Sequence, residues 1–111
     1  MFRGLTVTKS DDGAISASIG QLDDGFLPEE GEVTIKVHYA GLNYKDGLCL
    51  NGLGALIRDY PRIPGVECAG EVLESSDDRY KAGDKVVMTG WRFGETWHGG
   101  FAEKAKVKAD W

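Results

Sequence analysis

A short polar run near the middle of the chain carries groups that could do chemistry. Tyr44 has a phenol that both donates and accepts hydrogen bonds, so it could act as a general acid. Asn43 beside it offers a carboxamide, and Asp46 adds a carboxylate two residues later. Each also has a structural interpretation: Tyr44 as a partly buried aromatic, Asn43 as a helix cap, and Asp46 as a first-turn acid favoured by the helix dipole.

A carboxylate within a strand and an aromatic loop are the other candidates. Glu67 stands in an apolar run, where a buried carboxylate must be paired or hold a proton, and either would mark a site. Trp91 and Arg92 open the aromatic segment 91–98. This segment could simply cover one end of the fold, or it could form a wall of a substrate pocket where Arg92 meets an anionic group.

No metal site is predicted. His38, His98 and Glu67 could in principle combine imidazole and carboxylate ligands, but no pair among them has metal-site spacing. An exposed position on a strand is the favoured interpretation of His38. Two cysteines are too few for a disulfide scaffold, so Cys49 and Cys68 are expected to be free thiols, with Cys68 inert among apolar neighbours.

Alternating apolar residues and turn residues predict a mainly β domain around these candidates. Short strands are expected at 3–8, 13–20, 32–40, 66–74, 84–89 and 99–108. A short helix is expected over 43–51, ended by Asn51-Gly52. In 32–40 the pattern predicts Val33, Ile35, Val37 and Tyr39 on one face, with Thr34, Lys36 and His38 on the polar face. Six or so short strands with one helix favour a partly open β-barrel.

Size and charge restrict the function classes. The 111 residues fit one domain, and a net charge of −5 disfavours nucleic acid and anionic membranes as partners. Lys104, Lys106 and Lys108 are expected on the solvated face of a strand. No run approaches the roughly 20 apolar residues of a membrane span, and no signal-peptide pattern opens the chain, so the cytoplasm is the expected location.

Four spaced motifs resemble the medium-chain dehydrogenase/reductase superfamily. They are Gly41-Leu42-Asn43-Tyr44-Lys45-Asp46, the run 64–70, Gly83-Asp84-Lys85-Val86, and the run 99–103. The fuller runs 42–47 and 89–96 resemble its zinc-free branch of quinone oxidoreductase-like and acryloyl-CoA reductase proteins, and the resemblance covers essentially the whole chain. It implies a mainly β, GroES-like, partly open β-barrel with one or two short helices.

The resemblance also implies a reaction. The parent protein would use NADPH to reduce an activated C=C of acryloyl-CoA, a quinone or a related enone, and it would be a homodimer. The site residues that it implies are Tyr44, Asp46 and Glu67 in catalysis, Asn43 and Tyr44 at the cofactor, and Arg92 and Trp91 at the substrate, with Arg92 available to a CoA phosphate.

The cofactor itself would need more than this chain. Residues 1–111 are interpreted as the substrate domain alone, because the sequence has no Gly-rich strand–turn–helix unit to cradle a dinucleotide. A nucleotide-binding Rossmann domain is therefore expected to be absent from this chain, and the chain by itself to be catalytically inert.

Two positions depart from the zinc-dependent members of the superfamily. Those members carry Cys-His where Asn43-Tyr44 stand, and Gly-His-Glu where Gly65-Val66-Glu67 stand. The departures remove a thiolate and an imidazole, and a catalytic zinc needs three protein ligands of such kinds. The reaction is therefore expected to proceed without zinc.

An alternative from another functional class remains open. The flexible apolar stretch 52–57 has the character of the mobile loop of a co-chaperonin. The chain could accordingly be a freestanding GroES-like binding module without enzymatic activity.

Overall fold

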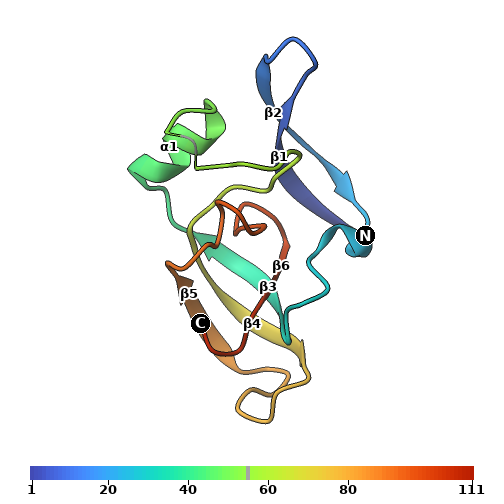
Figure 1. Cartoon of the computed structure of the whole chain (residues 1–111). Helices are drawn as coiled ribbons and strands as arrows, with labels where there is room; N and C mark the ends of the chain where they lie inside the picture. Colours follow the sequence, from blue (N-terminus) through green and yellow to red (C-terminus); the bar gives the residue numbers. More distant parts are fainter. Residues whose placement is uncertain (55) are drawn as a thin grey trace.

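The computed structural model describes residues 1–54 and 56–111 as a mainly β fold (Figure 1). Ala55, in the stretch that supports the binding-module alternative, lies outside the described residues. The elements are β1 (Phe2–Lys9), β2 (Ile15–Leu22), the 3-10 helix η1 (Asp24–Phe26), β3 (Val33–Ala40), α1 (Tyr44–Leu50), β4 (Glu67–Ser75), β5 (Lys85–Thr89) and β6 (Lys104–Val107). Among the described residues, no helix is long and apolar enough to cross a membrane.

The strands form two antiparallel sheets that do not close into one barrel. β1 and β2 make a hairpin, and the second sheet has the order β5-β4-β3-β6. In Figure 1 the hairpin and α1 lie at the upper end, and the four-stranded sheet extends below them. This arrangement confirms the predicted fold class, a partly open GroES-like barrel with short helices.

The main core lies between the inner face of the four-stranded sheet and the aromatic segment 91–98. Its buried members are Val33, Ile35, Cys68, Val72, Met88, Phe93, Trp97, Ala105, Val107 and Ala109. Ala105 and Val107 of β6 point inward, so Lys104 and Lys106 lie on the outer side, as predicted. Lys104 is only partly exposed there, because its ammonium group lies 3.2 Å from the carboxylate of Asp24.

The strict alternation predicted for β3 is wrong at its two ends. Tyr39, expected on the apolar face, is 78% exposed, whereas Thr34, expected on the polar face, is only 8% exposed. The pairing of β3 with β4 shifts register between Thr34 and Ile35 and again between Val37 and Tyr39. Such irregularities turn the following side chains to the other face. His38 is exposed, as predicted.

The strand predicted over 99–108 is also shorter than expected, since β6 begins only at Lys104. Gly99 and Gly100 instead cross the segment before β4 at close range. The N–H of Gly99 donates to the carbonyl of Ile63 at 2.8 Å, and that of Gly100 donates to the carbonyl of Gly65 at 3.0 Å. A Cβ at Gly99 would collide with the backbone of Gly65, so this crossing requires glycine.

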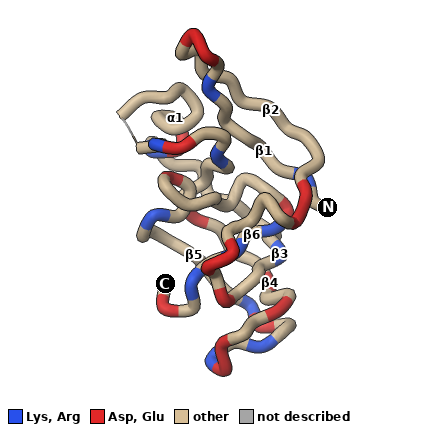
Figure 2. The backbone as a smooth tube through the Cα atoms, turned by 45° about the vertical axis from the view of Figure 1, so that its right-hand side comes forward, with Lys and Arg blue, Asp and Glu red and all other residues tan. Residues whose placement is uncertain are grey.

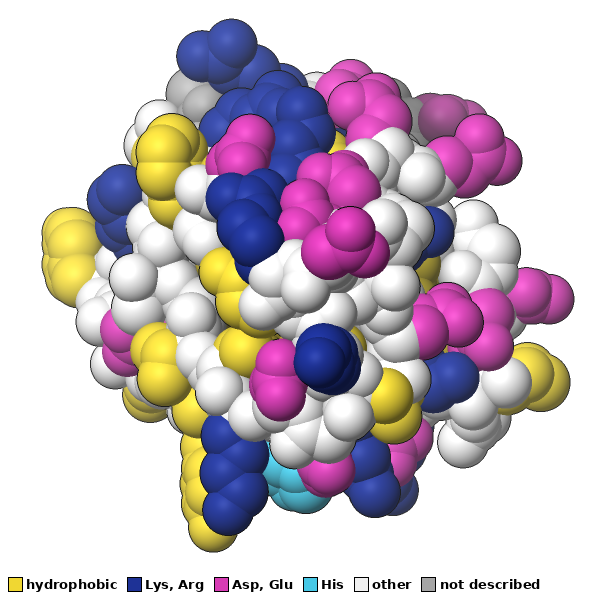
Figure 3. Space-filling model, turned by 90° about the horizontal axis from the view of Figure 1, so that it is seen from below, with side chains coloured by type: hydrophobic (Ala, Val, Ile, Leu, Met, Phe, Trp, Pro, Cys, Tyr) yellow, Lys and Arg dark blue, Asp and Glu magenta, His cyan; other side chains and the backbone are white. Residues whose placement is uncertain are grey.

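Charges of both signs are spread over the surface. Figure 2 shows acidic residues at the tip of the β1–β2 hairpin and charges of both signs at the β4–β5 turn. In that turn, Arg79 binds Asp77 and Asp110 at 3.0 and 2.7 Å and lowers the pKa of Asp77 to about 2. On the face drawn in Figure 3, acidic and basic side chains lie side by side over much of the surface.

His98 links the aromatic segment 91–98 to η1 and to the segment that precedes β4. Its Nδ1 accepts a hydrogen bond from the backbone N–H of Ile63 at 3.1 Å, and its ring stacks on Phe26 with centroids 4.4 Å apart. Burial, helped by the nearby charge of Arg62, lowers the pKa of His98 to about 4. The imidazole is therefore neutral in the folded chain at ordinary pH.

We predict that the free energy of unfolding falls as the pH decreases from 6.5 to about 4. In this window the unfolded chain protonates His98 while the folded chain does not, so protons favour unfolding; above it both forms are neutral and the histidine adds no slope. Urea unfolding at stepped pH measures the effect, and His98→Gln should flatten it. The separate loss below pH 3.8, from Asp77, should persist in the variant. If His98→Gln leaves the pH dependence of the free energy of unfolding between pH 6.5 and about 4 unchanged, the assignment to His98 is wrong.

Candidate functional site

The polar run singled out in the sequence lies where β3 ends, α1 begins and β4 starts. Ala40, the last residue of β3, pairs with Cys68 in β4, so the loop 41–43 passes directly beside the first residues of β4. The N–H of Gly41 donates to the carbonyl of Glu67 at 3.3 Å. This places the side chains of 43–46 and the start of β4 in one region.

Asp46 is the buried centre of this region. Its side chain is 0% exposed. One carboxylate oxygen, Oδ2, accepts from the N–H of Asn43 at 2.8 Å, and the other, Oδ1, accepts from the N–H of Val66 at 3.0 Å. Both oxygens are thus bound to backbone, and the carboxylate ties the start of α1 to the segment entering β4. The geometry favours a positioning role for Asp46 over direct contact with a substrate.

Tyr44 and Asn43 lie on the outer side of the same turn. Tyr44 is 84% exposed, so it is not the partly buried aromatic of the structural interpretation. Asn43 is also exposed and has extended backbone angles, φ −125° and ψ 162°, as the residue that caps α1. The phenol of Tyr44 is therefore accessible to a ligand, and Asn43 is held through its backbone N–H by Asp46.

Glu67 is half-buried and lies against Gly41. The Glu67 side chain occupies the space that a Cβ at position 41 would take, so a larger residue there would displace it. Within residues 1–54 and 56–111, no hydrogen bond or ion pair reaches the carboxylate. A shallow hollow beside it is lined by Tyr39, Ala69 and Val87. Glu67 is therefore accessible from this hollow and is not the buried, paired carboxylate considered from sequence.

The aromatic segment places Trp91 and Arg92 at the surface beside Trp111. Trp91 is 64% exposed, has a positive φ of 57°, and stacks almost parallel to Trp111 at 6.3 Å between ring centroids. The guanidinium of Arg92 lies 5.7 Å from the ring centroid of Trp97 and 5.9 Å from that of Trp111. Arg92 is thus held against two indole rings by cation–π contacts.

One contact in this region was missed from sequence. The Nζ atom of Lys45 lies 3.5 Å from Oε2 of Glu95, which links α1 to the aromatic segment. The same two parts also meet inside, where the thiol of Cys49 contacts the carbonyl of Gly94 at 3.7 Å. The only sequence signal was that Lys45 stands beside Tyr44 in the first motif, because nothing local relates it to a residue fifty positions away.

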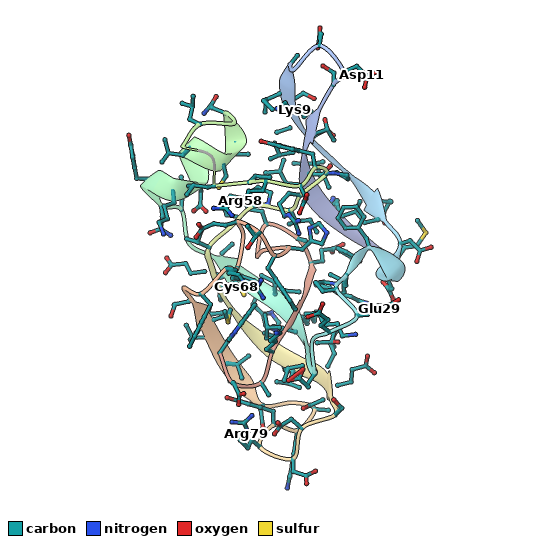
Figure 4. The ribbon with its side chains drawn as sticks, in the orientation of Figure 1. Lys9, Asp11, Glu29, Arg58, Cys68 and Arg79 are labelled. Atoms are coloured by element: carbon teal, nitrogen blue, oxygen red, sulfur yellow. The ribbon has the colours of Figure 1, made fainter. Side chains whose placement is uncertain are left out.

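The thiols and histidines do not combine into a metal centre in the described part of the chain. No three His, Cys, Asp or Glu side chains there are grouped to hold an ion. Burial raises the pKa of both Cys49 and Cys68 to about 11, and the carboxylates of Glu95 and Asp46 add to the effect at Cys49. Cys68 lies in the middle of the molecule (Figure 4). Both thiols are therefore protonated and unreactive at neutral pH.

Comparison with known proteins places these features in a family context. Residues 29–111 match the family model described as the alcohol dehydrogenase GroES-like domain. Over its whole length the chain is 53% identical to acrylyl-CoA reductase AcuI of Ruegeria pomeroyi, of which it covers 34%.

Solved structures agree with this comparison. The yhdH oxidoreductase from Salmonella enterica in complex with NADP superimposes with a TM-score of 0.93 at 45% identity, over 98% of this chain and 33% of that protein. Bacillus subtilis yhfP with NAD bound gives 0.91 at 40% identity, over 99% and 33%. The chain thus spans about a third of the length of these relatives.

We predict that Asp46→Asn destabilises the fold by on the order of 2 kcal/mol, because an amide can present an acceptor to only one of the two backbone N–H groups. Urea unfolding followed by tryptophan fluorescence measures the change. Asp78→Asn, at an exposed position of the β4–β5 turn, is the matched control and should stay within about 0.5 kcal/mol of the wild type. If the two substitutions change the free energy of unfolding equally, the two hydrogen bonds of the Asp46 carboxylate do not stabilise the fold as proposed.

Proposed function

This chain belongs to the alcohol dehydrogenase GroES-like domain family, and we propose that it is the substrate-binding part of an NADPH-dependent oxidoreductase. The proposed reaction reduces an activated C=C, with acrylyl-CoA, a quinone or a related enone as substrate. Its main support is the exposed phenol of Tyr44 beside Asn43, fixed by the buried carboxylate of Asp46. Its further support is the 53% identity to an acrylyl-CoA reductase, which also disfavours a freestanding binding module.

The chemistry required fits the groups on the outer side of α1. Bound NADPH would supply a hydride for the β-carbon of the substrate. Negative charge then develops on the carbonyl oxygen, and a proton must reach the α-carbon. Tyr44 can donate a hydrogen bond to that oxygen or a proton to that carbon, and solvent at its exposed phenol can restore the proton. Asn43 can orient the nicotinamide amide or the substrate through its carboxamide.

The accessible side chains around Tyr44 complete the proposed site. Glu67, open to the hollow beside Gly41, could assist proton transfer through water. Trp91 could form an apolar wall with its exposed indole face, and Arg92 stands next to it. Asp46 acts through the backbone that it holds, so within this proposal it is a positioning residue.

The described residues can border only one end of the cofactor. All pairings between strands β1 to β6 are antiparallel, and α1 spans only seven residues, so the described residues contain no strand–helix–strand cradle for the pyrophosphate. We therefore propose that residues 1–111 act as a substrate domain with a nucleotide-binding domain supplied by further polypeptide. The lengths of the relatives support this, and the NADP in the Salmonella structure supports NADPH as the cofactor.

The proposed reaction uses no zinc. Val66 offers no ligand side chain, and the Asp46 carboxylate beside it is already occupied by two backbone N–H groups. Polarising the substrate carbonyl would then depend on hydrogen-bond donors such as the exposed Tyr44 phenol.

We predict that Tyr44→Phe in the full-length enzyme lowers kcat for NADPH-dependent reduction of acrylyl-CoA by roughly 100-fold, because it removes the proton donor. Tyr80→Phe, which removes a phenol from the segment between β4 and β5, is the matched control and should leave kcat unchanged. The loss of NADPH absorbance measures the rate, and the isolated chain should give no turnover.

Two results would count against this assignment. If the wild-type enzyme reduces no activated alkene with NADPH, the proposed function is wrong. If Tyr44→Phe retains full kcat, the function stands but the role of Tyr44 does not.

A further inference from the structure

The ion pair between Lys45 and Glu95 joins two unequal partners. The side chain of Lys45 is 59% exposed, whereas that of Glu95 is only 18% exposed. Glu95 lies close enough to the buried Cys49 that its negative charge adds to the effect of burial in raising the pKa of the Cys49 thiol. The carboxylate is therefore largely covered by its surroundings, whereas the lysine is a long, solvated side chain that can move away from it.

Lys45 is an exposed cation of this region, as Arg58 is also. It directly follows Tyr44, the exposed residue of the proposed site. Arg92 is held over the rings of Trp97 and Trp111. Arg79, the cation bound by two carboxylates, lies at the end of the molecule far from α1 (Figure 4). An anionic group that approaches Tyr44 would accordingly meet the ammonium of Lys45 at the outer side of the same turn.

We propose that Lys45 is a specificity-determining residue that exchanges Glu95 for a phosphate group of the ligand bound beside Tyr44. This inference rests on the proposed function. A partly exposed lysine–carboxylate pair contributes little to stability, so the exchange costs little. A phosphate carries more charge than a carboxylate and more acceptor oxygens, and lysine is a common phosphate-binding residue. Both CoA and NADPH carry such groups, so either the substrate or the cofactor could supply the phosphate.

The exchange makes Glu95 a competitor of the ligand. Removing the positive charge of Lys45 would weaken phosphate binding, whereas removing the negative charge of Glu95 would strengthen it. If the pair only held α1 against the aromatic segment, both changes would break the same contact and act in the same direction. The sign of the two effects therefore separates ligand recognition from a structural role.

The test is a titration of the chain with CoA, with NADP and with pantetheine, which lacks phosphate, followed by NMR at the amides of Tyr44 and Lys45. No turnover is involved, so failure here is distinguishable from failure of the proposed function. Lys45→Met should raise the Kd about tenfold and Glu95→Gln should lower it about threefold. Lys45→Arg should stay near the wild type, because it keeps the charge.

The controls decide the source and the specificity of the effect. Lys36→Met removes the same charge from an exposed position on β3 and should leave the Kd unchanged. A response to CoA alone assigns the phosphate to the substrate, and a response to NADP alone assigns it to the cofactor. The proposal is overturned if Lys45→Met and Glu95→Gln shift the Kd in the same direction, if pantetheine responds as CoA does, or if the wild type shows no binding up to about 10 mM.

Discussion

The buried carboxylate of Asp46 is the interaction on which the arrangement of the site depends. A carboxylate without exposure to water is stable only when its oxygens accept good hydrogen bonds, and here two backbone N–H groups supply them, from Asn43 and Val66. Val66 lies twenty residues beyond Asp46 in sequence, so the carboxylate joins two separate segments. Asp46 and Cys49 face inward from α1, whereas Tyr44 and Lys45 are exposed in its first turn. The exposure of the proposed reactive groups thus follows from the burial of their neighbours.

A second constraint is the close crossing of backbones around Gly65. Gly94 and Gly99 approach Gly65 so closely that a side chain at either of them would collide with its backbone. The aromatic segment 91–98 therefore packs against the residues that lead into β4, and Asp46 accepts a hydrogen bond from one of these residues, Val66. Contacts with α1 complete the attachment, inside through Cys49 and at the surface through Lys45. The start of α1, the entry to β4 and the aromatic segment consequently behave as one unit.

The sequence predicted the elements better than their details, and the reason is the range of the interactions involved. Strand positions and the helix follow from local patterns, which is why β1 to β5 and α1 lie close to their predicted ranges. The exposure of Tyr39 depends on a register shift against β4, and the late start of the predicted last strand depends on a crossing at Gly65. Neither the register shift nor the crossing can be recognised from the residues next to it in sequence. Asp46 was found as a candidate, but its two partners, and the link from Lys45 to Glu95, become visible only once distant segments are brought together.

The exposure of the site carries a further consequence for catalysis. Hydrogen-bond donors stabilise developing charge strongly only where water is excluded, since water screens and competes for the same oxygen. Tyr44 is 84% exposed and Trp91 is 64% exposed, so this surface does not supply that environment by itself. Under the proposed function, a second surface would have to cover these aromatic side chains before the phenol could act efficiently. This requirement agrees with relatives about three times as long as the chain and with the missing pyrophosphate cradle among the described residues. It follows that the same covering surface would bring the cofactor and exclude water, so binding and activation of the site would be a single event.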